Sequence, residues 1–253
     1  MPKQAPEEKK FSELRSHVEA AANELDLATM FYEVWRIGVE DKSLHDRLGV
    51  SYATNAFRIV VTALRREALL GLLRLWDKRS DSLRVDFIAK GACAPAMIAY
   101  IAKLRGSKID ANMVRGPSRL GRSSLDAITA SVKASLEEKA QLILKIVDKY
   151  DRNGSGRPTF DKLMTLRHER LAHHNPKAVS APDKNATDEE IETFYNDNAE
   201  LIRLLLSLVK ATAYDPGDGA EIYRTYANLF WASVRGERTE GHPQYRLPRT
   251  DTA

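Results

Sequence analysis

Arg167, His168, His173 and His174 stand close together in a segment that reads Leu-Arg-His-Glu-Arg-Leu-Ala-His-His from position 166. An arginine keeps its charge at any working pH and binds phosphate through a planar fork of N–H donors. Histidine is the side chain that can both take and give a proton near neutral pH. These residue types are sufficient to cleave a phosphodiester bond of RNA without a metal ion, so all four are candidate catalytic residues.

The candidate residues lie toward the end of an expected helix, which Thr159 would cap and Asn175-Pro176 would end. Arg167 falls in the middle of the apolar face of that helix, which is formed by Phe160, Leu163, Met164 and Leu171. A charged group at such a position is unfavourable unless it is paired or used. Pairing with a buried carboxylate such as Asp77 is one explanation of Arg167.

Two histidines have a spacing from Arg167 that fits the same chemistry. Five residues separate Arg167 from His173 and six separate it from His174, and a helical wheel puts His174 nearer to the face of Arg167. Arg170 lies one turn after Arg167 and is a candidate second phosphate contact. An ordinary helix C-terminus, where cations complement the helix dipole, would also explain Arg170, His173 and His174.

A second group of cations gathers around a segment that contains several glycines. Because residues 105–121 also include Pro117, we expect this segment to be a loop whose cations contact an RNA backbone without reading its sequence. A solvated connection explains the same pattern equally well. The candidate RNA- or phosphate-binding residues here are Lys103, Arg105, Lys108, Arg115, Arg119 and Arg122.

Composition bounds the class of protein. The chain has 253 residues, of which 43% are hydrophobic and 29% charged, with a net charge of +4, as in a globular protein. Cys93 is the only cysteine, which excludes an intramolecular disulfide and favours a reducing cytoplasm. We expect no signal peptide in residues 1–10, because they lack an apolar core, and no membrane-spanning segment.

Apolar residues recur at helical spacing and no segment alternates with a period of two, so we expect an all-α antiparallel bundle. A break is expected near Leu25-Asp26, another at Pro95, and a capping box at Thr187 and Glu190. Residues 1–10 and 236–253 are expected to be disordered extensions of a domain that spans 11–235. The expected helices cover about 11–48, 52–76, 83–104, 123–150, 159–174, 188–214 and 220–234.

We expect neither a metal nor another cofactor. Residues 151–156 resemble the start of a calcium loop, but Lys162 occupies the twelfth position, where a bidentate Glu is required. A tight turn between two helices explains this segment better.

Residues 166–173 resemble the signature of the HEPN superfamily, an arginine followed after four to six residues by a histidine. They look most like the abortive-infection AbiU-like branch, which typically shows Leu-Arg and then Ala-His at these places. A second patch, residues 69–77 followed by Ser82-Leu83, is similar to the aliphatic helix of that branch, which ends in Asp before a Ser-Leu helix start. The resemblance covers about residues 27–214.

This resemblance implies a homodimer in which two motif helices face each other across a composite cleft, so the apolar face around Arg167 would meet a partner subunit. It implies a metal-independent endoribonuclease in which His173 moves protons and Arg167 binds the scissile phosphate. The Ala-His context favours His173 over His174. His168 stands where the family usually has a polar residue and would orient the site or the phosphate.

The resemblance also suggests a role in prokaryotic defence or in a toxin–antitoxin system. RNA is then the first partner, and an antitoxin or another defence protein is a second candidate. The alternative is a non-catalytic module of the same fold that binds a nucleotide, RNA or protein. A third interpretation is a purely structural helical protein.

Overall fold

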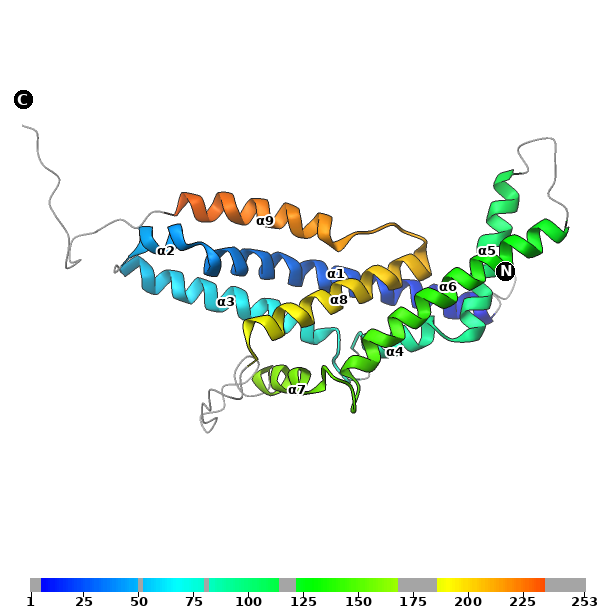
Figure 1. The fold of residues 1–253 in the computed structure, drawn as a ribbon, viewed down its shortest axis with the longest axis horizontal. Helices are drawn as coiled ribbons and strands as arrows, with labels where there is room; N and C mark the ends of the chain where they lie inside the picture. The colour runs from blue at the N-terminus through cyan, green and yellow to red at the C-terminus, as the bar shows by residue number, and fades with distance from the viewer. Residues whose placement is uncertain (1–5, 50–51, 80–81, 114–121, 168–185, 235–253) are drawn as a thin grey trace, which may run out of the picture. The chain divides into compact units, whose positions relative to one another are not determined.

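The computed structural model describes residues 6–49, 52–79, 82–113, 122–167 and 186–234, without the side chains of 110–113 and 122–123. Every regular element in these ranges is an α-helix, which confirms the all-α helical fold (Figure 1). The helices are α1 (Pro6–Glu40), α2 (Lys42–Leu48), α3 (Tyr52–Arg74), α4 (Val85–Ala92), α5 (Pro95–Met113), α6 (Arg122–Tyr150), α7 (Arg157–Leu166), α8 (Asp188–Lys210) and α9 (Pro216–Ser233).

The expected break at Leu25-Asp26 is wrong, because α1 runs through it. The break comes instead at Asp41, whose carboxylate accepts a hydrogen bond of 3.1 Å from the Leu44 N–H and starts α2. The break expected at Pro95 is confirmed, since this residue begins α5 in the first helical turn, where its missing N–H costs nothing. None of the described helices alone has the length and apolar content to cross a membrane, and α4 with α5 reaches both only across a 63° bend.

The loop expected to begin at Arg105 is also wrong in its first part, because α5 continues to Met113. Gly106 suggested a loop, but it lies within the helix and is buried against α6. A Cβ at this position would come 2.4 Å from Oγ1 of Thr129, so the glycine lets the two helices approach closely. Residues 114–121 lie outside the described residues.

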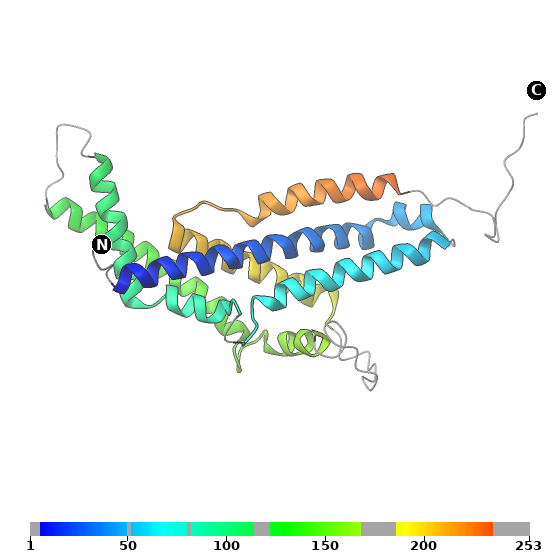
Figure 2. The ribbon, with the colours of Figure 1, turned by 180° about the vertical axis from the view of Figure 1, so that it is seen from behind.

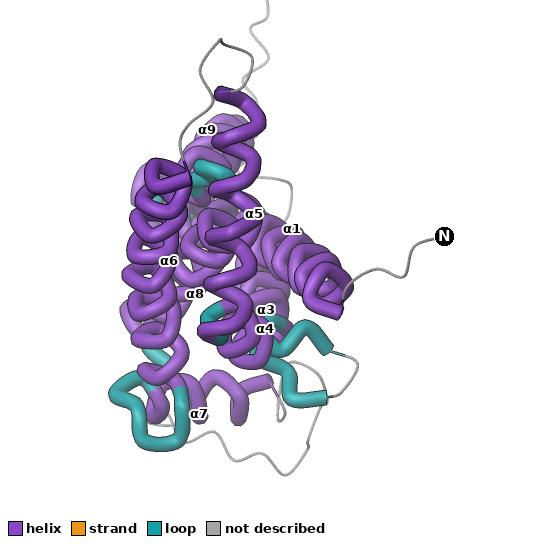
Figure 3. Tube along the Cα trace, turned by 90° about the vertical axis from the view of Figure 1, so that its right-hand side faces the viewer, coloured by secondary structure: helices purple, strands orange, loops and turns teal. Residues whose placement is uncertain are grey.

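The chain divides into two compact units, which we describe separately. The first comprises Met1–Leu25 and Gly71–Pro216. Within it α6 packs against α4, α5, α7 and α8, as the end-on view shows (Figure 3). Its core is formed by aliphatic residues of these helices and by aromatic side chains around Trp76 and Phe194.

The second unit comprises Asp26–Leu70 and Gly217–Ala253. Here α9 runs beside the second half of α1, and the first half of α3 lies along the same segment (Figure 2). Its core surrounds Trp231, which packs with Leu44, Leu48 and Phe57 and donates a hydrogen bond of 2.8 Å to the Val34 carbonyl.

Candidate functional site

Arg167 is the first residue of the candidate segment and the last one that the structure describes there. It follows Leu166, the end of α7, and keeps helical backbone angles with φ −57° and ψ −51°. His168, Arg170, His173 and His174 lie outside the described residues. The geometry of the site is therefore that of Arg167 and of the side chains that hold it.

A tight turn after α6 sets the direction of α7. Gly154 folds back so closely that a Cβ would come 2.2 Å from the carbonyl oxygens of Asp148 and Lys149, which only glycine avoids. The N–H of Gly156 then donates 2.8 Å to the Lys149 carbonyl. Thr159 does not cap α7 as expected, because the helix already begins after Gly156, with a proline in the first turn whose fixed φ suits a helix.

Two polar side chains fasten α7 to the start of α8. Lys162 Nζ lies 2.7 Å from Glu190 Oε1, and the Thr159 hydroxyl lies 3.3 Å from the same oxygen. Glu190 also completes the expected capping box with Thr187, which is confirmed: each residue's side chain accepts from the other's backbone N–H. The expected N-cap Thr159 thus binds the capping box of the next helix.

An aromatic cluster supports the buried side of α7. Trp76, Tyr150, Phe160 and Phe194 contact one another with ring centroids 5.1–6.4 Å apart, largely in tilted or edge-on arrangements. Trp76 Nε1 donates 2.8 Å to the buried amide oxygen of Asn198. Burial, followed by hydrogen bonding to Asp197, raises the pKa of the Tyr150 hydroxyl, so this group stays protonated and donates.

Arg167 forms an ion pair with Asp77 of the connection between α3 and α4. Its Nη2 lies 2.7 Å from Oδ2, and the two side chains are only 15% and 11% exposed. Arg79, largely exposed, contributes a guanidinium at 3.3 Å and a backbone N–H to the same carboxylate. Burial acts to raise the pKa of Asp77, but the bond to Arg167 and these other contacts outweigh it and hold the pKa below its usual value.

The pair explains within one chain why Arg167 lies on an otherwise apolar face. Phe160 and Leu163 of that face are buried, and Arg167, one turn after Leu163, meets a carboxylate. A partner subunit is not needed to account for the charge. Only Nη2 bonds to Asp77, and among the described residues no other acceptor takes Nε or Nη1.

The basic segment is only partly described. Arg105 donates from Nη2 to the carbonyls of Ser207 and Leu208, at 2.8 and 2.7 Å, so it satisfies orphan acceptors at the end of α8. Lys103 and Lys108 are exposed on α5. The side chains of Arg115, Arg119 and Arg122 lie outside the described set. The guanidinium of Arg105 is therefore engaged within the fold.

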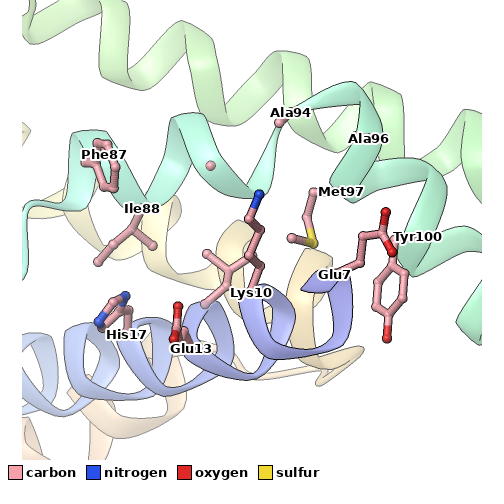
Figure 4. Close-up of a pocket in the computed structure, with 12 residues that line it drawn as sticks. Glu7, Lys10, Glu13, His17, Phe87, Ile88, Ala94, Ala96, Met97 and Tyr100 are labelled. Carbon is pink, nitrogen blue, oxygen red and sulfur yellow. The ribbon is translucent and has the colours of Figure 1, made fainter. Parts of the chain in front are cut away.

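A groove of about 430 Å³ lies elsewhere in the first unit (Figure 4). Charged residues of α1, among them Lys10 and Glu13, face Phe87, Met97 and Tyr100 of α4 and α5 across it. Among the candidate residues whose side chains are described, none lines this groove. The described part of the chain also contains no group of three His, Cys, Asp or Glu residues that could hold a metal ion.

Two features of the site were not apparent in the sequence. Arg79 was not singled out, although its place two residues after Asp77 is the usual spacing of an Asx turn. The aromatic cluster was missed as a unit, because Trp76 and Phe194 are far in sequence from each other and from Tyr150 and Phe160. Trp76, directly before Asp77, was the one available signal.

No curated protein and no solved structure matches the chain. Among protein-family models, residues 11–230 match HEPN_AbiU2, described as AbiU2. This match covers both patches that meet in the structure, the end of the α3 segment with Asp77 and the α7 segment with Arg167. The chain therefore belongs to the AbiU2 family of HEPN proteins.

Proposed function

We propose that this protein is a metal-independent endoribonuclease whose site is built on Arg167 and the histidines that follow it. Membership of a HEPN family supports this proposal, as does the spacing of Arg167 and His173. The observation that carries it is the single bond from Arg167 to Asp77, which holds the guanidinium at the start of the histidine segment.

The way in which Arg167 is held suits a phosphate-binding role. Asp77 engages Nη2, and Nε and Nη1 make no bond to any described residue, so part of the fork remains for a phosphate oxygen. The side chain is 15% exposed, which lowers the local dielectric and strengthens its attraction for an anion. Asp77 thus acts as a positioning residue that sets the direction of the guanidinium.

The proposed reaction needs no group beyond the side chains and the RNA. His173 takes the proton of a ribose 2′-hydroxyl, and the 2′-oxygen attacks the adjacent phosphorus. The bond from phosphorus to the 5′-oxygen breaks, and that oxygen leaves with a proton supplied by a protonated histidine. The products are a 2′,3′-cyclic phosphate and a 5′-hydroxyl, while Arg167 stabilises the charge that develops on the phosphate.

The remaining candidate residues take supporting roles in this proposal. His174 is the alternative acid–base group, His168 orients the site, and Arg170 is a second phosphate contact. The exposed Lys103 and Lys108, together with Arg115, Arg119 and Arg122, contact the RNA backbone. We further propose that two copies form a composite site in the cytoplasm, in a defence or toxin–antitoxin role with a regulatory partner protein.

The second candidate function is a non-catalytic module that binds RNA, a nucleotide or a protein. The observation that favours it is the same ion pair, because Asp77 neutralises much of the charge that a scissile phosphate would require. In this case Asp77 and Arg167 form a structural pair. The ribonuclease would cleave RNA with turnover, whereas the binding module would hold its ligand without cleaving it.

The test is cleavage of a labelled single-stranded RNA in EDTA by the wild-type protein and by variants. Arg167→Ala and His173→Ala are expected to lower the rate by on the order of 10²–10³-fold, because they remove a phosphate contact and the proton carrier. His174→Ala tells which histidine reacts. Arg157→Ala is the matched control, since Arg157 begins the same helix, pairs with the largely exposed Asp161 and lies over the ring of Phe160.

The products provide a second readout. RNA with a 2′-methoxy group at the cleaved position should resist cleavage, and the wild-type fragments should end in a 2′,3′-cyclic phosphate. Equal cleavage by Arg167→Ala and Arg157→Ala would disprove the proposed site. A shift of RNA in a gel without fragments would support the binding module instead.

A further inference from the structure

Helix α9 carries apolar side chains on two opposite faces. Its inner face is formed by Ala220, Ala227 and Trp231, which are buried in the second unit. Its outer face carries four large apolar side chains that are between 50% and 68% exposed, namely Ile222, Tyr226, Leu229 and Phe230. A surface helix of a globular protein is normally polar on the side away from the core.

The four side chains form one continuous stripe, which we call the α9 stripe. Their spacing of i, i+4, i+7 and i+8 places them on one face of a helix. Together they expose on the order of 400–500 Å² of apolar surface, given the area of aromatic side chains. A patch of this size on a monomer is often functional.

The inner contacts of α9 fix the direction of the stripe. Arg224 makes two bonds of 3.1 Å to the buried carboxylate of Glu33, and the Tyr223 hydroxyl donates 3.0 Å to Asp26. The ring of Phe230 meets Trp231 edge-on at 4.8 Å between centroids. Because these contacts hold the helix, the stripe is presented without a further loss of backbone freedom on binding.

The charge pattern argues against a membrane or a nucleic acid as the occupant. Interfacial membrane helices carry lysines and arginines beside their apolar face. The only basic side chain of α9 is Arg224, which is bonded to Glu33. Asp218 and Glu221, at the beginning of the helix, would repel phosphate groups.

The shape of the stripe suits a second copy of itself. Ile222, Tyr226 and Phe230 form an i, i+4, i+8 ridge, and the neighbouring row has small side chains at Thr225 and Ser233 on either side of Leu229. Ridges of this type interdigitate between two helices in the commonest class of helix packing. Antiparallel packing would also keep the acidic beginnings of the two helices apart.

We propose that the α9 stripe is an interface between two copies of this chain, formed by antiparallel packing of α9 against α9. Two stripes bury about 1,000 Å² in total, the area at which a specific interface becomes plausible. The interface is isologous, so residues near the two-fold axis meet their own counterparts. The proposal rests on the exposed side chains of α9 and not on the ribonuclease proposal.

The first test is the oligomeric state by sedimentation velocity over a concentration series. The wild-type protein is expected to dimerise, and the double variant Leu229→Gln with Phe230→Gln is expected to weaken the dimer at least about tenfold. The matched control is Ile59→Gln with Val60→Gln, an adjacent pair of exposed apolar residues on α3 of the same unit. Circular dichroism and melting temperature show whether each variant is folded.

The second test is a cross-link that does not depend on the double variant. Tyr226 is the midpoint of the ridge, so oxidation of Tyr226→Cys should join two copies through one disulfide. Cys93 does not compete, because burial raises the pKa of its thiol to about 12. The wild-type protein is therefore the uncross-linked control.

The outcomes are distinct from those of the cleavage assay. A wild-type protein that remains monomeric, or a folded double variant that dimerises as tightly as the wild type, would overturn the proposal. Equal weakening by the α3 control would overturn the assignment to α9. Suppose that the wild type cleaves RNA and that the double variant associates as tightly as the wild type. The ribonuclease proposal would then stand, and only the α9 interface would be excluded.

Discussion

Each unit of this protein contains an arginine that binds a buried carboxylate, and the two pairs are built differently. In the second unit Arg224 donates hydrogen bonds from two nitrogens to the Glu33 carboxylate, each at 3.1 Å, and the Glu33 side chain is 2% exposed. In the first unit Arg167 meets Asp77 through one nitrogen at 2.7 Å. The two-bond pair uses the fork for the fold, whereas in the one-bond pair Asp77 engages a single nitrogen, and we propose that a phosphate takes the rest of the fork.

The surroundings of the two pairs differ as well. Arg167 stands at the end of a helix that rests on four aromatic rings, and the described apolar residues of this unit are mostly buried. The second unit exposes most of the large apolar side chains found on the described surface, including the α9 stripe. We therefore propose the chemistry for the first unit and the association for the second.

The largest expected effect comes from removing the packing beneath α7. Phe160→Ala should lower the free energy of unfolding by about 3–5 kcal/mol, because it empties a buried aromatic site. Phe87→Ala, at an exposed site of the same unit, should change it by less than about 1 kcal/mol. Urea denaturation measures both. Similar losses in the two variants would mean that the aromatic cluster does not hold α7 as described.

A smaller effect separates the two ion pairs. Double-mutant cycles of the unfolding free energy, for Asp77 with Arg167 and for Glu33 with Arg224, should give couplings between about 0.5 and 3 kcal/mol. The coupling of the second pair should be larger, because it has two bonds.

The two pairs should also differ in the cleavage assay. Asp77→Asn should slow the reaction of the wild type by on the order of 10–100-fold, because Arg167 is then misplaced. Glu33→Gln should leave the rate unchanged. Slower cleavage by Glu33→Gln than by Asp77→Asn would contradict the assignment of the reaction to the pair of Arg167 and Asp77.

The smallest effect is the acid dependence of the first pair. The pKa of Asp77 is lower in the folded protein than in the unfolded chain, so its contribution to stability is present above about pH 4. That contribution is lost as the pH falls through the lowered pKa. The unfolding free energies of the wild type and of Asp77→Asn should therefore converge as the pH falls below about 4. A gap that widens on acidification would contradict the assigned shift.

The helices and one cap could be predicted from sequence because their causes are local. Apolar spacing located the helical segments, and Thr187 with Glu190 carried a complete capping signature. The partner of Arg167 was also within reach, since a charge on an apolar face demands a carboxylate and Asp77 lay at the end of a helix.

The errors occurred where a tertiary contact decided the outcome. In sequence Gly106 suggests a loop, but it lies within α5, where its missing side chain leaves room for Thr129 of α6. Arg105 reads as a surface cation, but two carbonyls at the end of α8 bind it. Neither neighbour is near in sequence, so no local pattern could reveal it. Helix α9 has apolar residues on both faces, so its sequence did not show which face would pack inward and which would carry the α9 stripe.

The bond between Arg167 and Asp77 joins residues that are 90 positions apart. During synthesis Asp77 emerges long before Arg167, so the guanidinium can be oriented only after most of the chain has left the ribosome and collapsed. A partly made chain therefore has the residues of the site without its geometry. For the proposed ribonuclease, this order of assembly would protect the messenger from its own unfinished product.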